Sequence, residues 1–108
     1  MNNMTDMIMG FAPTHPGEIL KAELEERGIK QMQLAENMGM SYKMLNDILN
    51  ERRPITTETA MMFEAALDIP ATVLLELQMK YNIHVAQKDE ALLKKLRAIK
   101  KIAASIVL

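Results

Sequence analysis

Polar side chains suited to reading nucleic-acid bases gather within one short stretch of the chain. Lysine can donate to the acceptors of guanine, asparagine can bond adenine through two atoms, aspartate can accept from cytosine, and tyrosine can touch a thymine methyl group. All four residue types stand between residues 42 and 47. If this stretch forms a helix in a major groove, its outward side chains meet base edges. The candidate base-reading residues are Ser41, Tyr42, Lys43, Asn46 and Asp47.

A second group of polar residues flanks this stretch and could hold phosphate, because amides at a helix start and arginines both suit that anion. The phosphate candidates are Gln31, Gln33, Arg52 and Arg53. Either arginine could instead pair with Glu51 or Glu58, and both alternatives stay open. Asp47 would repel phosphates unless it bonds a cytosine or a neighbouring cation. Lys43, four residues earlier, can be that cation if the stretch is helical.

Two short helices joined by a tight turn must position these side chains. Ala35, Gly39, Leu45 and Ile48 follow one another at spacings of four, six and three residues. Helices crossing at about 90–120° leave room only for a small residue at the crossing, and the turn needs a residue that tolerates positive φ. Ala35 and Gly39 meet these requirements, so the pattern predicts a helix-turn-helix over residues 31–50. A helical hairpin that never meets nucleic acid is the alternative.

Three further helices are predicted around this motif. One covers residues 17–28, another follows a cap at Thr56 or Thr57, and a fifth covers residues 71–82. Scarce glycine and proline, together with plentiful alanine, leucine, methionine, glutamate and lysine, favour an all-α fold. The chain is predicted to divide into an N-terminal arm over 1–16, a helix-turn-helix domain over 17–83 and a C-terminal helix over 84–108.

The C-terminal segment is basic and amphipathic. Its leucines and isoleucines recur at spacings of four and three residues, which is a heptad stripe. Residues 84–108 carry six cations and two acids, a net charge of +4, whereas the whole chain carries −1. The stripe can pair with a second copy or pack on its own domain, and the charge can face phosphate or an acidic partner. Pairing candidates from the fifth helix and this stripe are Leu74, Leu75, Leu77, Leu92, Leu96 and Ile99.

Composition argues against several classes of protein. The chain has no cysteine and two histidines, His15 and His84, so thiolate metal sites are excluded and a histidine metal site is not expected. We expect both histidines to cap or pack, and we expect no enzyme, metal or cofactor because reactive groups do not converge. No apolar run approaches the ~20 residues of a membrane span, and no secretory signal is present, so a cytoplasmic location without membrane contact is expected.

Segment 15–83 resembles the HigA-type antitoxins, also called the VapI-like group, within the XRE, lambda-repressor-like helix-turn-helix proteins. The motifs that carry the resemblance are HPGEIL at 15–20, QMQLAENMGMS at 31–41, LNDILNERRPIT at 45–56, ETA at 58–60 and LLELQMKYN at 74–82. The resemblance implies a five-helix operator-binding domain, usually dimeric, to which the C-terminal helix is an addition. It also implies a RelE-like toxin as partner, which cuts mRNA on the ribosome, and repression of the pair's own operon.

Besides its basic C-terminal helix, which extends past the end of many members, the chain departs from this family in two places. Glu51 follows Asn50 where the family commonly has glycine, so the turn geometry is in question. Apolar residues 73–75 replace a common Phe-Trp pair. Three functions stay open: a DNA-binding antitoxin and autoregulator, a stand-alone repressor of the same fold, and a protein-interaction module without DNA binding.

Overall fold

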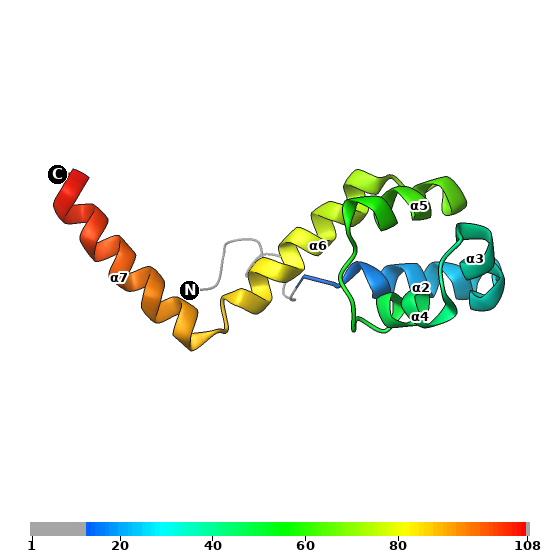
Figure 1. The fold of residues 1–108 in the computed structure, drawn as a ribbon, viewed down its shortest axis with the longest axis horizontal. Helices are drawn as coiled ribbons and strands as arrows, with labels where there is room; N and C mark the ends of the chain where they lie inside the picture. Colours follow the sequence, from blue (N-terminus) through cyan, green and yellow to red (C-terminus); the bar gives the residue numbers. More distant parts are fainter. Residues whose placement is uncertain (1–12, 108) are drawn as a thin grey trace.

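The computed structural model describes residues 13–107, and every regular element in that range is a helix (Figure 1). The helices are α2 (Pro16–Arg27), α3 (Gln31–Met38), α4 (Tyr42–Leu49), α5 (Thr57–Leu67), α6 (Ala71–Ala86) and α7 (Glu90–Val107). The predicted all-α class, with five helices and an additional C-terminal helix, is confirmed. Residues 1–12 of the predicted N-terminal arm lie outside the described residues.

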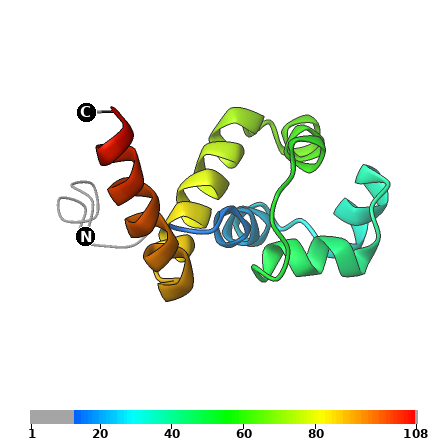
Figure 2. The same cartoon turned by 60° about the vertical axis from the view of Figure 1, so that its left-hand side comes forward.

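The first five of these helices form the body of the molecule. Helix α2 packs against α4 and α6, α3 packs against α4 and α5, and α5 packs against α6. Figure 2 shows α3 and α4 meeting at an angle at the end of the body away from α7. Their shared core is made of large apolar side chains with at most 2% exposure: Leu20, Leu24, Leu45, Ile48, Leu49, Phe63, Leu67 and Leu74.

Helix α2 is capped at both ends. The Gly17 N–H donates to Nδ1 of His15 over 2.9 Å, Pro16 occupies the first turn, and Gly28 ends the helix with a φ of 67°. The His15 ring is buried and meets the edge of the Tyr81 ring, with 4.8 Å between centroids. The expectation that His15 caps or packs is confirmed. Because Nδ1 accepts a bond, the cap requires the neutral imidazole.

Gly17 sits where α2 crosses α4. A Cβ atom at this position would collide with the backbone carbonyl oxygen of Ile48, so no other residue fits between the two helices. Sequence reasoning had assigned the small-residue role to Ala35, which is buried beside α4. The requirement for a small residue is stricter at Gly17 than at Ala35, because the backbone of Ile48, which cannot move aside, lies opposite Gly17.

Two turns take the left-handed conformation as their positions require. Gly39 ends α3 with a φ of 66°, as the helix-turn-helix pattern predicts. Glu51 has a φ of 65°, so the turn after α4 adopts the conformation that glycine favours although its residue is glutamate.

The loop from α4 to α5 is tied to α6. The Ile55 N–H donates to Oε1 of the buried Gln78 over 2.8 Å, and Gln78 Nε2 donates to Asn82 Oδ1. Helix α6 continues beyond the predicted residue 82 to Ala86, so His84 lies within it rather than after it.

Helix α7 extends away from the body beyond the end of α6 (Figure 1). The Cα radius of gyration is 17.7 Å, larger than the roughly 13 Å of a compact chain of this length. Leu96 and Ile99 of its stripe are about half exposed, at 48% and 54%. Leu74, one of the pairing candidates, is instead fully buried in the core and offers no surface to a partner. No helix among the described residues is both long and apolar enough to cross a membrane.

Replacing Gly17 by alanine should destabilise the fold by about 2–3 kcal/mol, because the added methyl group overpacks a contact with rigid backbone. Gly28→Ala is the matched control: it has open space around it and adds only the strain of its φ of 67°. Thermal and denaturant unfolding of both variants measures the difference. Equal stability of Gly17→Ala and the unchanged protein would contradict this packing.

Stability should fall as the pH drops below the ordinary histidine value of about 6.5. Burial lowers the pKa of His15, against a smaller opposing effect of the Glu51 charge. The unfolded chain therefore takes up this proton at a higher pH than the folded chain, so the stabilisation is complete above pH 6.5 and is lost as the pH falls through the folded-state pKa. Melting temperatures at pH 7.5 and 5.5 test this. His15→Asn keeps a capping side chain and should reduce the difference; an unchanged pH dependence would exclude His15 as its source.

Candidate nucleic-acid interface

Helix α4 turns one face to the core and the other to solvent. Leu45, Ile48 and Leu49 are buried, whereas Tyr42 and Lys43 are exposed. Ser41 caps the helix, because its Oγ accepts the Met44 N–H over 3.1 Å. Four of the predicted base-reading residues, Ser41, Tyr42, Lys43 and Asn46, thus lie along the outer side and N-terminal end of α4.

Asn46 joins both helices of the motif to the following loop. Its Nδ2 donates to Gln31 Oε1 over 3.1 Å, and its Oδ1 accepts from Arg52 over 2.9 Å. A guanidinium only donates, which fixes the amide orientation of Asn46. The structure therefore brings together Asn46, which the sequence analysis assigns to a base, and Gln31 and Arg52, which it assigns to phosphates.

Asp47 lies beneath two cations. Its Oδ2 accepts from Lys43 Nζ over 2.9 Å, and its Oδ1 accepts from Arg52 Nε over 3.1 Å. The hydrogen bond from Lys43, followed by that from Arg52, holds the pKa of the Asp47 carboxyl below its ordinary value. The Asp47 side chain is only 13% exposed, because both cations cover the carboxylate that the sequence analysis offers to a cytosine. The Lys43 neighbour suggested by the spacing of four is present.

This arrangement leaves hydrogen-bonding capacity on the outer side of α4. An amide has two N–H donors and two lone pairs on oxygen, so Asn46 keeps one donor and one acceptor after bonding Gln31 and Arg52. Adenine requires that pair of groups in the major groove. The Lys43 ammonium keeps two donors after bonding Asp47, which suits guanine O6 and N7. The side chains are thus held in place without being saturated.

The loop after α4 positions the two arginines. The Arg52 N–H donates to the Asp47 carbonyl oxygen over 2.8 Å, which folds the loop back on the helix. Arg52 pairs with Asp47 rather than with the Glu51 or Glu58 alternatives. Arg53 is exposed, and no ion pair joins it to another described residue.

Sequence reasoning missed a bond that fixes the end of α4. Lys21 Nζ of α2 donates to Asn50 Oδ1 over 3.1 Å, and Asn50 Nδ2 donates to the Asn46 carbonyl oxygen over 2.9 Å. Lys21 thereby adds a cation beside α4. Its contact spans 29 residues, so no local spacing signals it.

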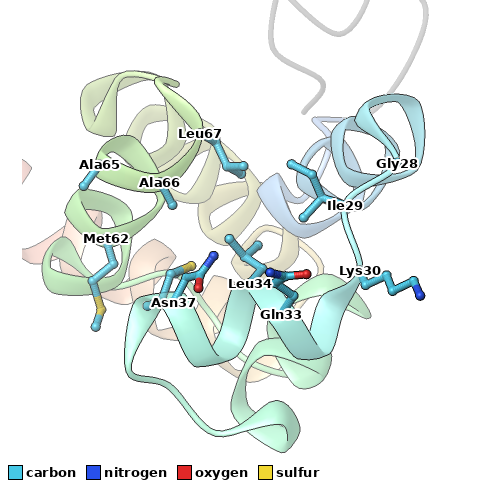
Figure 3. Close-up of a pocket in the computed structure, with 11 residues that line it drawn as sticks. Gly28, Ile29, Lys30, Gln33, Leu34, Asn37, Met62, Ala65, Ala66 and Leu67 are labelled. Carbon is cyan, nitrogen blue, oxygen red and sulfur yellow. The ribbon is translucent and has the colours of Figure 1, made fainter.

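Gln33 is separated from the Gln31 cluster. It lines an open groove of about 680 Å³ between α3, α5 and the turn at Gly28 (Figure 3). The groove has an apolar floor that includes Leu34, with Lys30 and Asn37 among its polar lining residues. Gln33 and Gln31 therefore lie on different sides of α3, and only Gln31 joins α4. No cluster of metal-ligating side chains occurs among residues 13–107.

Comparison with known proteins places the same segment in a family. A family model described as helix-turn-helix matches residues 20–74. Virulence-associated protein I of Dichelobacter nodosus is 34% identical over 77 residues, which cover 70% of this chain and 71% of that protein. The solved antitoxin GraA is similar with a TM-score of 0.68 and 32% identity over 72% of this chain and 85% of its own. The Pseudomonas aeruginosa antitoxin HigA, solved with the higBA promoter, has a TM-score of 0.65 and 36% identity over 68% and 82% of the two chains.

Proposed function

This chain belongs to the helix-turn-helix family and is a homologue of the VapI-like, HigA-type antitoxins, and we propose that it binds operator DNA through α4 and represses its own operon. The family consists of DNA-binding proteins rather than enzymes. We propose a cytoplasmic location, because the protein must have access to operator DNA.

The observation that carries the proposal is the set of held but unsaturated side chains on α4. Asn46 and Lys43 are fixed by Gln31, Arg52 and Asp47, and each retains the donors or acceptors that a base edge needs. Such preorganisation lowers the entropy lost on binding. A purely structural hairpin has no need to hold these groups on its outer side.

The remaining polar residues divide by the part of DNA that they would meet. Ser41 and Tyr42 accompany Lys43 and Asn46 at the N-terminal end of α4, where a recognition helix meets bases. Gln31, Arg52 and Arg53 flank that surface and are proposed to hold phosphates, which positions the helix without reading sequence.

The partner that we propose besides DNA is a RelE-like toxin that cuts mRNA. The support is similarity to two solved proteins called antitoxins. Purification of the tagged chain from its own cells tests the proposal: a small toxin should accompany it. Absence of such a partner, with operator binding intact, would instead favour a stand-alone repressor.

A homodimer is the proposed DNA-binding form. One copy of this motif contacts too few base pairs for specificity, and related folds read two half-sites about one helical turn apart. Leu75 and Leu77 of α6 and Leu92 of α7 are half-buried, and Leu96 and Ile99 of the α7 stripe are exposed. An exposed apolar stripe of this kind is typical of an interaction surface.

Removing a base-reading side chain should weaken operator binding far more than binding to random DNA. Lys43→Ala or Asn46→Ala should each lose about 1–3 kcal/mol on the operator and much less on a scrambled duplex. Gln31→Ala should weaken both complexes by similar factors, because a phosphate contact carries no sequence information. Titrations of both duplexes, with thermal melts, measure these effects.

Lys94→Ala is the charge-matched control for Lys43→Ala, since it removes the same charge from α7, far from α4. It should leave the specificity ratio unchanged. Full operator affinity in folded Lys43→Ala and Asn46→Ala proteins would contradict a reading role for α4 and assign the motif to protein contacts.

Sedimentation should detect a dimer at tens of micromolar protein. Ile99→Lys should shift the protein towards monomer without lowering the stability of the body, because Ile99 is exposed and lies outside the core. Lys94→Ala again serves as control. A monomer under these conditions, both free and on DNA, would exclude the proposed pairing.

A further inference from the structure

We propose that Asp47 is a specificity-determining residue, which holds the charges of Lys43 and Arg52 and so limits binding to phosphates of non-cognate DNA. This inference rests on the proposed DNA-binding function and adds to it a residue that touches neither base nor phosphate. It concerns discrimination between sequences rather than affinity for the operator alone.

The cluster consists of Lys43, Arg52 and Asp47, in which two exposed cations cover one largely buried acid. The side chains of Lys43 and Arg52 are 83% and 59% exposed, whereas that of Asp47 is 13% exposed. Each carboxylate oxygen accepts from a different cation, at 2.9 and 3.1 Å. The acid therefore holds two flexible side chains that solvent would otherwise leave free to reach any nearby phosphate.

A carboxylate at this place opposes tight DNA binding in general. Without Asp47, the end of the motif would carry four cations, Lys21, Lys43, Arg52 and Arg53, against a single exposed acid of the same loop, Glu51. Uniform positive charge favours every duplex alike, because the phosphate attraction is independent of sequence. An acid within such a surface weakens the non-specific complex, and a repulsive element of this type is a common means of discrimination.

The same acid is compatible with reading a cognate base. Lys43 retains two N–H donors while it bonds Asp47, so it can donate to a guanine edge without breaking the ion pair. If Lys43 or Arg52 moves away from the carboxylate to reach a phosphate, its ion pair with Asp47 is broken, and this loss weakens the phosphate contact. The hydrogen bonds from Lys43 and then Arg52 lower the pKa of the Asp47 carboxyl, which agrees with an ionised acid paired to both cations.

Asp47→Asn tests the proposal, with Glu64→Gln as the matched control. Glu64 is exposed on α5 and makes no ion pair with another described residue, so its change removes one negative charge away from the cluster. The probes are a duplex from the chain's own upstream region and a scrambled duplex of the same length and composition. Affinities are measured from 50 to 200 mM salt.

Asp47→Asn frees Lys43 and Arg52. For each of the two that then contacts a phosphate, affinity for the scrambled duplex at 0.1 M salt should rise about tenfold. The slope of log affinity against log salt concentration should become steeper by about 1–2 units. Affinity for the upstream duplex should change less, so the specificity ratio should fall. Glu64→Gln should change little on either duplex. Asp47→Glu retains the charge and should retain the unchanged protein's salt slope.

Equal scrambled-duplex affinity and salt slope in Asp47→Asn and Glu64→Gln would overturn the proposal. Loss of upstream binding at unchanged scrambled binding would also overturn it, because Asp47 would then read a base or orient one that does. If Asp47→Asn does not melt like the unchanged protein, Asp47→Ser removes the same charge with a smaller side chain. Failure of the unchanged protein to prefer its upstream duplex would instead count against the proposed function.

Discussion

The close approach of α2 to α4 is the contact on which the rest of the structure depends. Gly17 lies against the Ile48 carbonyl oxygen, so the backbones of the two helices meet with no side chain between them. His15 caps α2 at the same place, and its ring packs on Tyr81 of α6. The position of α4 is therefore set by rigid backbone on its inner side, and the direction of its outer side chains follows from that position.

The outer side of α4 combines two requirements that oppose each other. Side chains that read bases must be held in place, yet they must keep free donors and acceptors. The network meets both because each member has more hydrogen-bonding capacity than its internal partners use: Asn46 bonds Gln31 and Arg52 and still offers a donor and an acceptor. Asp47 completes the network at the expense of general affinity for phosphate, which is the basis of its proposed role in discrimination.

Local sequence patterns predicted most of the fold and supplied the residues of the proposed interface, but they did not predict how those residues contact one another. Helix starts and ends depend on neighbouring residues, so Gly28 and Gly39 were recognisable, as was the Lys43–Asp47 pair at a spacing of four. Contacts between distant segments left no such pattern. The glycine required at position 17 and the core position of Leu74 follow only from how the helices pack.

Guanine-N7 methylation interference on the chain's upstream duplex tests the central claim most directly, because it reports which groove the protein reads. The account predicts that methylation within two half-sites about one helical turn apart blocks binding, since α4 would meet guanine N7 in the major groove. Binding that tolerates methylation at every guanine of the site would contradict major-groove reading by α4.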